Sequence, residues 1–187
     1  MKLLQIISTA ALSLALLNTN AQPAPKGFAR GSITLADNST IRGFVKDNIR
    51  KDASVSIFND GKETTYAGAQ INGAETVNGN FICIHGDFFK VISNGSLSFL
   101  QKSSDASSQP SFNGTDVMFN NGTEGNPGDY FVYNSKTKDL KLVSRKTLNS
   151  VVATSFGGYA PAVEKAKAAQ ANLVALKEAV DEYNNRK

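Results

Sequence analysis

The sequence predicts a mainly β fold: an antiparallel meander, sandwich or barrel-like sheet, followed by a C-terminal helical segment. Two observations carry this prediction. Short runs rich in β-branched and aromatic residues recur about every 8 to 12 residues, with Asn-Gly or Asp-Gly turns between several of them. After Ser144 the apolar residues change to helical spacing. The expected organisation is a signal peptide over residues 1–21, an antiparallel β domain over 22–145 and a helical segment over 146–187.

The first residues have the layout of a secretory signal peptide. Met1 and Lys2 give a positive start, an apolar run extends from Leu3 to Leu17, and small residues stand at Thr19 and Ala21. Cleavage is expected after Ala21, which predicts a secreted or periplasmic protein. Since no second apolar stretch of membrane length and no cysteine at the cleavage site occur in the sequence, no transmembrane or lipid anchor is expected.

The β domain is expected to begin with consecutive hairpins. Gly31–Leu35 and Thr40–Val45 alternate apolar with polar residues on either side of the polar turn Asp37-Asn38-Ser39. The same pattern predicts three further hairpins: Ser54–Phe58 with Lys62–Tyr66, Ile71–Val77 with Phe81–His85, and Phe88–Ser93 with Leu97–Gln101.

The regular spacing of the predicted strands is interrupted in the middle of the chain. Lys102–Thr115 contains Ser, Gln and Pro110 and is expected to be a long surface loop. Asp116–Asn120 and Asp129–Asn134 are expected to pair around the glycine-rich segment between them. Leu140–Val143 is the last predicted strand.

Two helices are expected after Ser144. Thr147 is placed to cap a short helix through Phe156, which Gly157-Gly158 ends. Pro161 suits the first turn of a second helix of about 23 residues. That helix carries one apolar stripe, formed by Val163, Ala166, Leu173, Leu176, Val180 and Tyr183. The stripe either packs on the β domain as a lid or forms a surface for a protein partner or a homo-oligomer.

The N-terminal half resembles a known group of proteins. The residues that carry the resemblance are Gly31–Leu35, Asp37, Thr40–Val45, Tyr66 and Asn78-Gly79-Asn80-Phe81. They are similar to a pattern in uncharacterised secreted β-rich proteins of Bacteroidetes bacteria, whose signal peptides often end, as here, in Ala-Gln. The resemblance implies export and a β-rich fold, and it implies no active site.

Charge and composition bear on the class of partner. The formal net charge is +4, and loss of Lys2 with the signal peptide lowers it to +3. Basic residues are scattered, and the short groups Lys46–Lys51 and Lys136–Lys146 contain acidic residues. Since a nucleic-acid groove needs a concentrated basic stripe with stacking aromatics, no nucleic acid is expected as a partner.

Cys83 is the only cysteine, so no intramolecular disulfide can form. It lies in the apolar run Phe81–Ile84, which favours a buried structural thiol. His85, the only histidine, follows at i+2 on the same face of the predicted strand, so a Cys83/His85 nucleophile pair is the alternative. His85-Gly86-Asp87 supplies too few ligands for a zinc site and is expected to form a turn.

Oxygen-bearing side chains suggest two further sites. The loop Asn120–Asp129 combines Asn, Glu and Asp with three glycines, which suits either calcium or an ordinary turn. A glycosidase would need two carboxylates facing one cleft. The candidates, mostly beside predicted turns, are Asp47, Asp52, Asp60, Glu63, Glu75, Asp87, Asp105, Asp116, Glu124, Asp129 and Asp139.

These patterns assign no catalytic, cofactor-binding or metal-binding residue and predict no cofactor. No Gly-x-Ser-x-Gly elbow or phosphate-binding loop occurs in the sequence. The leading hypothesis is an exported, non-enzymatic binding, envelope-associated or structural module. The alternatives are an exported hydrolase that uses carboxylates or Cys83/His85, and an assembly protein that acts through its C-terminal helix.

Overall fold

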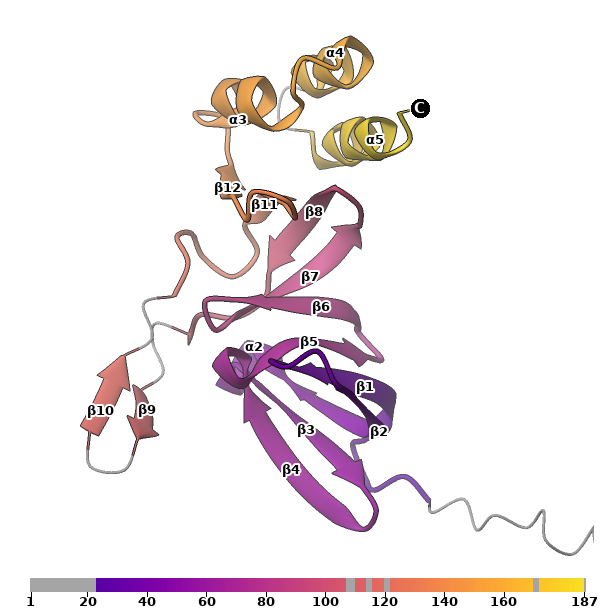
Figure 1. Cartoon of the computed structure of the whole chain (residues 1–187), viewed down its shortest axis with the longest axis vertical. Coiled ribbons are helices and arrows are strands. Elements are labelled where there is room, and N and C mark those ends of the chain that lie inside the picture. The colour runs from indigo at the N-terminus through magenta and orange to yellow at the C-terminus, as the bar shows by residue number, and fades with distance from the viewer. Residues whose placement is uncertain (1–22, 107–109, 114–115, 120–121, 170–171, 187) are drawn as a thin grey trace, which may run out of the picture.

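The computed structural model describes residues 23–106, 110–113, 116–119, 122–169 and 172–186. It is mainly β: ten strands form one antiparallel sheet in the order β12-β11-β8-β7-β6-β5-β1-β2-β3-β4. Figure 1 shows this sheet running down the molecule, with the C-terminal helices gathered at one end. The predicted fold class is therefore confirmed. The predicted signal peptide, residues 1–21, lies outside the described residues.

The N-terminal half of the sheet consists of six strands. They are β1 (Ala29–Leu35), β2 (Thr40–Asn48), β3 (Ser54–Asn59), β4 (Lys62–Ala67), β5 (Ile71–Thr76) and β6 (Gly79–Ile84). A helical turn, α2 (Ile49–Asp52), follows β2, and a 3-10 turn, η2 (Gly68–Gln70), precedes β5. The predicted hairpins of this half are present. Asp60-Gly61 and His85-Gly86 both adopt positive φ at their turns, as two-residue hairpin turns of this type require.

The C-terminal half of the sheet contains β7 (Asp87–Ser93), β8 (Leu97–Lys102), β11 (Tyr130–Asn134) and β12 (Leu140–Val143). A separate hairpin of β9 (Pro110–Asn113) and β10 (Asp116–Phe119) stands apart from the sheet in Figure 1. Three helices complete the chain: α3 (Leu148–Ser155), α4 (Ala160–Ala168) and α5 (Leu173–Asn184).

The N-terminal half curls around its own apolar core. Alternate residues of its strands, among them Ile33, Val55 and Phe81, are buried together with Phe88 from β7. Two glycines permit the tight curl. A Cβ on Gly31 would lie 2.2 Å from the Glu75 carbonyl oxygen, and one on Gly43 would lie 2.6 Å from that of Phe58. A side chain at either position would therefore separate neighbouring strands.

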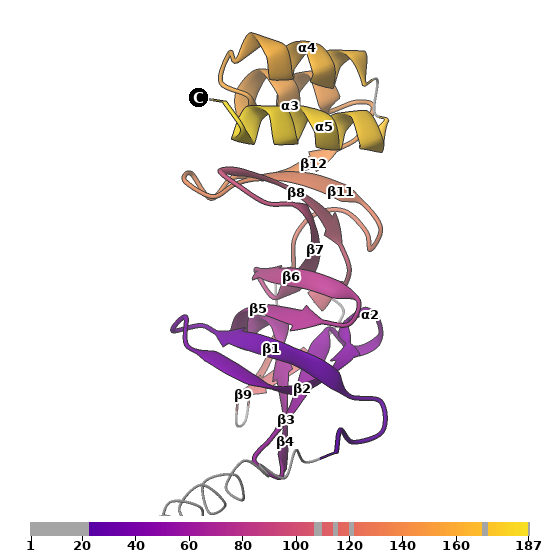
Figure 2. The ribbon, with the colours of Figure 1, turned by 90° about the vertical axis from the view of Figure 1, so that its right-hand side faces the viewer.

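The C-terminal half is covered on one face by the helices, as Figure 2 shows from the side. Leu97 and Phe99 of β8 and Val132 of β11 are buried against this layer. The helical residues of the same core are Leu148, Val151, Val152, Phe156, Ala162, Ala166, Ala169, Leu176, Ala179 and Val180. The lid interpretation is thus confirmed for Leu176 and Val180, and Tyr183 is half-buried. The side chain of Leu173 lies outside the described part of the chain.

Polar contacts fix α5 on the β7–β8 turn. The Asn184 side chain accepts a hydrogen bond from the Leu97 amide at 3.1 Å and donates one to the Leu97 carbonyl at 2.8 Å. Ser93 donates to the Asp181 carboxylate. Since backbone groups at the end of a strand need partners when partly buried, these bonds complement the apolar packing of the helix.

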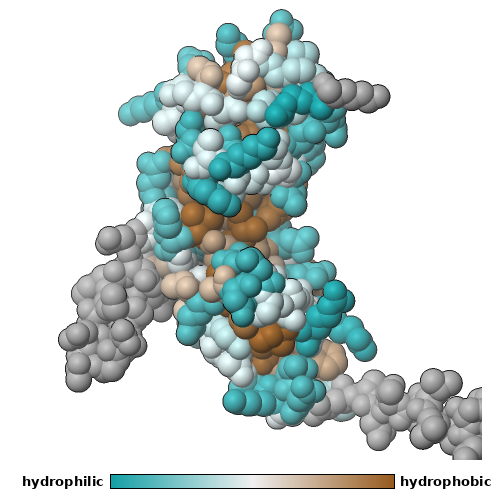
Figure 3. Space-filling view, in the orientation of Figure 1, coloured by the Kyte–Doolittle hydropathy of each residue, from teal (hydrophilic) through white to brown (hydrophobic). Residues whose placement is uncertain are grey.

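The opposite face of this half-sheet is not sealed in the same way. Phe89, Leu100 and Phe131 are buried there, while Ile82, Ile84, Val91, Tyr133, Leu140 and Leu142 are only partly buried around them. Figure 3 shows apolar surface gathered at the waist of the molecule, below the helical layer. The two faces therefore differ, because helices cover only one of them.

Two strand predictions were wrong. Lys102–Thr115 was expected to be a loop, but it contains β9. Asp116–Asn120 was expected to pair with Asp129–Asn134, but β10 pairs with β9, and β11 lies between β8 and β12. The register of β11 places Tyr133 and Phe131 on one face and Val132 on the other, so both of its faces contribute to apolar cores. Because β11 lies inside the sheet, between β8 and β12, the apolar side chains on both of its faces can be buried.

The predicted single helix from Pro161 was also wrong in length, because the chain forms α4 and α5 instead. A new helix start is built at Asn172, whose side chain accepts a hydrogen bond from the Val174 amide at 3.0 Å. The break lets α5 turn back against α4, so that α5 packs on β7 and β8 while α4 packs on α3 and α5.

Candidate binding site

Cys83 and His85 line one shallow hollow beside η2, but no hydrogen bond joins them among the described contacts. His85 is exposed and occupies the β6–β7 turn with φ of 51°. Burial, with a smaller contribution from the Asp87 carboxylate, raises the pKa of the Cys83 thiol. A nucleophilic cysteine needs the opposite change, because the thiolate is the reactive form.

We expect Cys83 to react slowly with thiol reagents in the native protein. Because its pKa is raised, the thiolate fraction at pH 8 falls below that of a free cysteine, and labelling should be at least about tenfold slower than in the urea-unfolded chain. Absorbance of the released aryl thiolate measures both rates. Equal rates for the native and unfolded protein would restore Cys83 as a candidate nucleophile.

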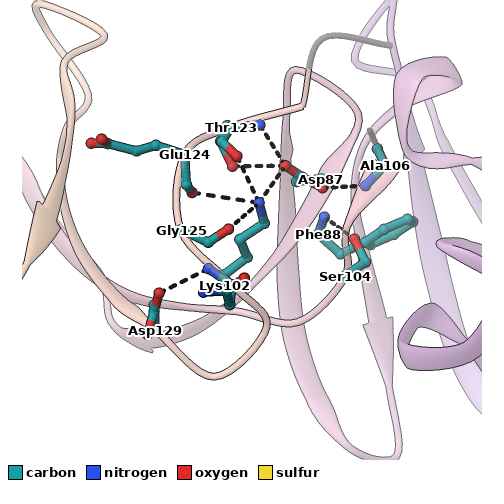
Figure 4. A network of polar contacts seen from close by, with 10 residues as sticks. Asp87, Phe88, Lys102, Ser104, Ala106, Thr123, Glu124, Gly125 and Asp129 are labelled. Carbon is teal, nitrogen blue, oxygen red and sulfur yellow. Dashed lines mark hydrogen bonds and ion pairs between the residues drawn. The ribbon is translucent and has the colours of Figure 1, made fainter. Parts of the chain in front are cut away.

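Asp87, predicted as a turn residue, is instead fully buried in an ion pair with Lys102, shown in Figure 4. Asp87 Oδ2 lies 3.1 Å from Lys102 Nζ and accepts hydrogen bonds from the amide and hydroxyl of Thr123, both at 2.7 Å. Asp87 Oδ1 accepts from the Ala106 amide at 2.6 Å. Asp87 therefore joins the start of β7 to the segments that follow β8 and precede β11.

The Lys102 ammonium occupies the position at which the sequence suggested a cation. Its Nζ donates to the carbonyl oxygens of Thr123 at 2.7 Å and Gly125 at 3.0 Å, and that of Glu124 lies at 3.4 Å. The Asp129 carboxylate accepts from the Asn126 amide. Of the predicted loop, Asn120 and Asn121 lie outside the described residues. In the part that is described, the carbonyl groups coordinate the protein's own ammonium group.

Two of the clefts in the described part of the protein are lined by carboxylates proposed for a hydrolase, and each contains one of them: Asp47 in one and Glu75 in the other. The described residues also contain no group of three His, Cys, Asp or Glu side chains close enough to hold a metal ion. Every buried side-chain nitrogen and oxygen atom in the described part has a hydrogen-bond partner. Asp87 forms an ion pair with Lys102. One cleft is lined by cations that have no ion pair among the described residues, and Asp47 is its one carboxylate in that part of the protein.

That cleft, which we call the central cleft, lies where the two halves of the sheet meet and has a volume of about 490 Å³. Its N-terminal wall comes from the end of β2, α2 and the β5–β6 turn. Its C-terminal wall comes from β7, β8 and the segment before β11. The described residues that line it are Asp47, Ile49, Arg50, Asn78, Phe81, Lys90, Gln101, Lys102, Ser103, Pro127 and Gly128.

Two cations of the central cleft remain unpaired. Arg50 is exposed and Lys90 is half-buried, and neither forms an ion pair with any residue that the structure describes. The alkyl chain of Lys90 lies along Gly79, where an added Cβ would be 3.1 Å from Lys90 Cε. Sequence reasoning missed both residues, because they are 40 positions apart and only the pairing of strands brings them to one cleft.

The one carboxylate in the cleft forms no ion pair with either cation among the described contacts, and its hydrogen bonds come from neutral donors of the wall. Asp47 Oδ1 accepts from the Ile49 amide at 3.0 Å. Asp47 Oδ2 accepts from Asn78 Nδ2 at 2.8 Å and from Thr76 Oγ1 at 3.2 Å. The cleft thus presents an excess of positive charge above a floor that includes Phe81 and Ile49, both buried apolar residues.

Comparison with protein-family models, curated proteins and solved structures found no match. The resemblance to secreted Bacteroidetes proteins therefore stays a prediction. Within the described residues, no helix has both the length and the apolar character needed to cross a membrane.

Proposed function

We propose that this protein is an exported, non-enzymatic binding module that takes a carboxylate-bearing ligand with an apolar body in the central cleft. The observation that carries the proposal is the pair of unpaired cations, Arg50 and Lys90, on the walls of one cleft. Export rests on the predicted signal peptide.

The chemistry of the lining residues supports this class of ligand. A guanidinium group binds a carboxylate through two parallel hydrogen bonds, and an ammonium group adds a second positive charge. Phe81, Ile49 and Pro127 line the cleft next to the cations, and ligand sites are commonly lined by apolar residues. Gln101 is held in place, since its Nε2 donates to Gly128 and to the Tyr130 hydroxyl.

The alternatives have less support. A hydrolase needs an activated nucleophile or a pair of carboxylates, whereas the Cys83 pKa is raised and the central cleft has one carboxylate among its described residues. An assembly function through the tail needs an exposed apolar stripe, whereas Leu176 and Val180 are buried within their own chain.

Titration with benzoate, followed by amide chemical shifts, tests the proposal. Benzoate should bind with a dissociation constant on the order of 1 mM, and the shifts should cluster at Arg50, Lys90 and Gln101. Benzamide has the same shape without the charge and should bind at least about tenfold more weakly, because the contact with the cations is lost. The double variant Arg50→Gln/Lys90→Gln should weaken benzoate binding by a similar factor.

The matched control is Lys136→Gln/Lys146→Gln, which removes two exposed cations that do not line the cleft. It changes the net charge equally and should leave benzoate binding unchanged. Equal binding of benzamide, or undiminished benzoate binding by the folded Arg50→Gln/Lys90→Gln variant, would refute the proposal.

A further inference from the structure

A second group of cations lies on the outer face of the N-terminal half-sheet, the face turned away from its core. The register places Arg30 across from Phe44, and Ser32 across from both Arg42 and Glu75. Because alternate residues of a strand share a face, Arg42, Phe44 and Lys46 follow one another along the outer side of β2. We call Arg30, Ser32, Arg42, Phe44, Lys46 and Glu75 the outer face.

The cations of the outer face have no ion-pair partner among the described residues, and two of them lie over aromatic rings. Arg30, Arg42 and Lys46 are exposed, and none of them forms an ion pair within the described part of the chain. The Arg30 guanidinium lies 5.7 Å from the centre of the Phe44 ring, and Lys46 Nζ lies 6.0 Å from that of Phe28. Such contacts restrain long side chains without using their hydrogen-bond donors.

The outer face is also hollowed. Arg30, Ser32, Arg42, Phe44 and Glu75 line one depression, so two guanidinium groups, a hydroxyl, an aromatic ring and a carboxylate border the same space. The Glu75 carboxylate accepts a hydrogen bond from Ser32 Oγ at 3.2 Å and is otherwise exposed. The depression therefore offers donors for an anionic group beside an acceptor for hydroxyl groups.

We propose that the outer face binds an acidic polysaccharide, with sugar carboxylates on Arg30 and Arg42 and sugar hydroxyls on Glu75. The carboxylate distinguishes this partner from a membrane surface or a nucleic acid. Glu75 repels an anionic group of either kind, carboxylate or phosphate, but it also accepts hydrogen bonds from hydroxyl groups, which a sugar chain carries on every ring. Lys46 extends the positive row along β2, about 13 Å beyond Arg42, which suits a linear chain. This surface is separate from the central cleft and does not depend on the function proposed for that cleft.

Binding to biotinylated polygalacturonate, measured by biolayer interferometry, tests this inference, with dextran as the neutral control. Polygalacturonate should bind and dextran should not. Arg30→Gln/Arg42→Gln should weaken binding by at least about tenfold, since two charge-assisted contacts are lost. The control Lys136→Gln/Lys146→Gln changes the charge equally and should alter binding by less than about twofold, because exposed distant charges are screened.

Glu75→Ala separates sugar recognition from simple attraction between charges. If Glu75 accepts sugar hydroxyls, the variant should bind polygalacturonate more weakly, although it is more positive. Tighter binding by Glu75→Ala would overturn the inference and indicate a general anion surface. Equal or stronger binding of the wild-type protein to phosphatidylglycerol vesicles or to a single-stranded oligonucleotide would also overturn it. Far-ultraviolet circular dichroism establishes that each variant is folded, and benzoate titration of the same variants shows whether the central cleft is intact.

Discussion

Replacing Lys102 by methionine should lower the free energy of unfolding by about 3–5 kcal/mol, because it leaves the Asp87 carboxylate buried without its counter-charge. Both side chains are fully buried, and the Lys102 ammonium is also the group on which the Thr123 and Gly125 carbonyl oxygens converge. Methionine fills a similar volume but donates no hydrogen bond. Urea unfolding followed by tyrosine fluorescence measures the change, since the chain contains no tryptophan.

Two further variants show whether the loss comes from the buried pair. Asp87→Asn/Lys102→Met removes both charges and should be more stable than the sum of the single changes predicts, because no unpaired charge remains. Lys165→Met breaks the exposed pair with Glu182 and should have a far smaller effect, since solvent screens that pair. If Lys102→Met were as mild as Lys165→Met, the buried network would not hold the segment 123–125 in solution.

Leu176→Ala should cost about 2–5 kcal/mol of stability, through lost apolar burial and the cavity left behind. Leu176 has no exposed surface and packs in the core that α3, α4 and α5 share with β8 and β11. Since a helix as short as α5 is marginal in water by itself, its stability depends on this packing. Thermal or urea unfolding measures the loss, and light scattering should show an unchanged oligomeric state.

Val174→Ala is the matched control on the same helix. Val174 is 69% exposed, so its truncation should change stability only slightly. The opposite pattern, with stability intact and a dimer or complex lost in Leu176→Ala, would mean that the stripe of α5 serves an interface between chains.

Hairpins and turns were the most predictable part of this fold, because their signals are local. The Asp60-Gly61 pair predicts a tight turn because both residue types tolerate positive φ, which both adopt in the structure. The strands on either side of this turn pair with each other. The pairing of β10 was not predictable in this way. The alternation of apolar and polar residues in a strand predicts which of its faces is buried. It does not predict which of several distant strands lies beside it.

The helical break shows the same limit. Residues 168–171, Ala-Ala-Gln-Ala, are strong helix formers, so local propensity favours one continuous helix there. Asn172 was the available signal for a new helix start, and its side chain does cap α5. The preference for two helices comes from tertiary packing, because α4 and α5 lie against each other and both bury apolar residues in the core that they share with α3, β8 and β11.

Residue periodicity and turn chemistry are enough to predict the mainly β class, the positions of most strands and the side of α5 that is buried. Which charged side chains come into contact depends instead on how the strands pair. Strand pairing buries Asp87 with Lys102, and it brings Arg50 and Lys90 to the walls of one cleft, where neither has an ion-pair partner among the described residues. The physical reason is that Coulomb and hydrogen-bond contacts depend on separation in space, and in an antiparallel sheet that separation is set by strand pairing between residues far apart in the chain.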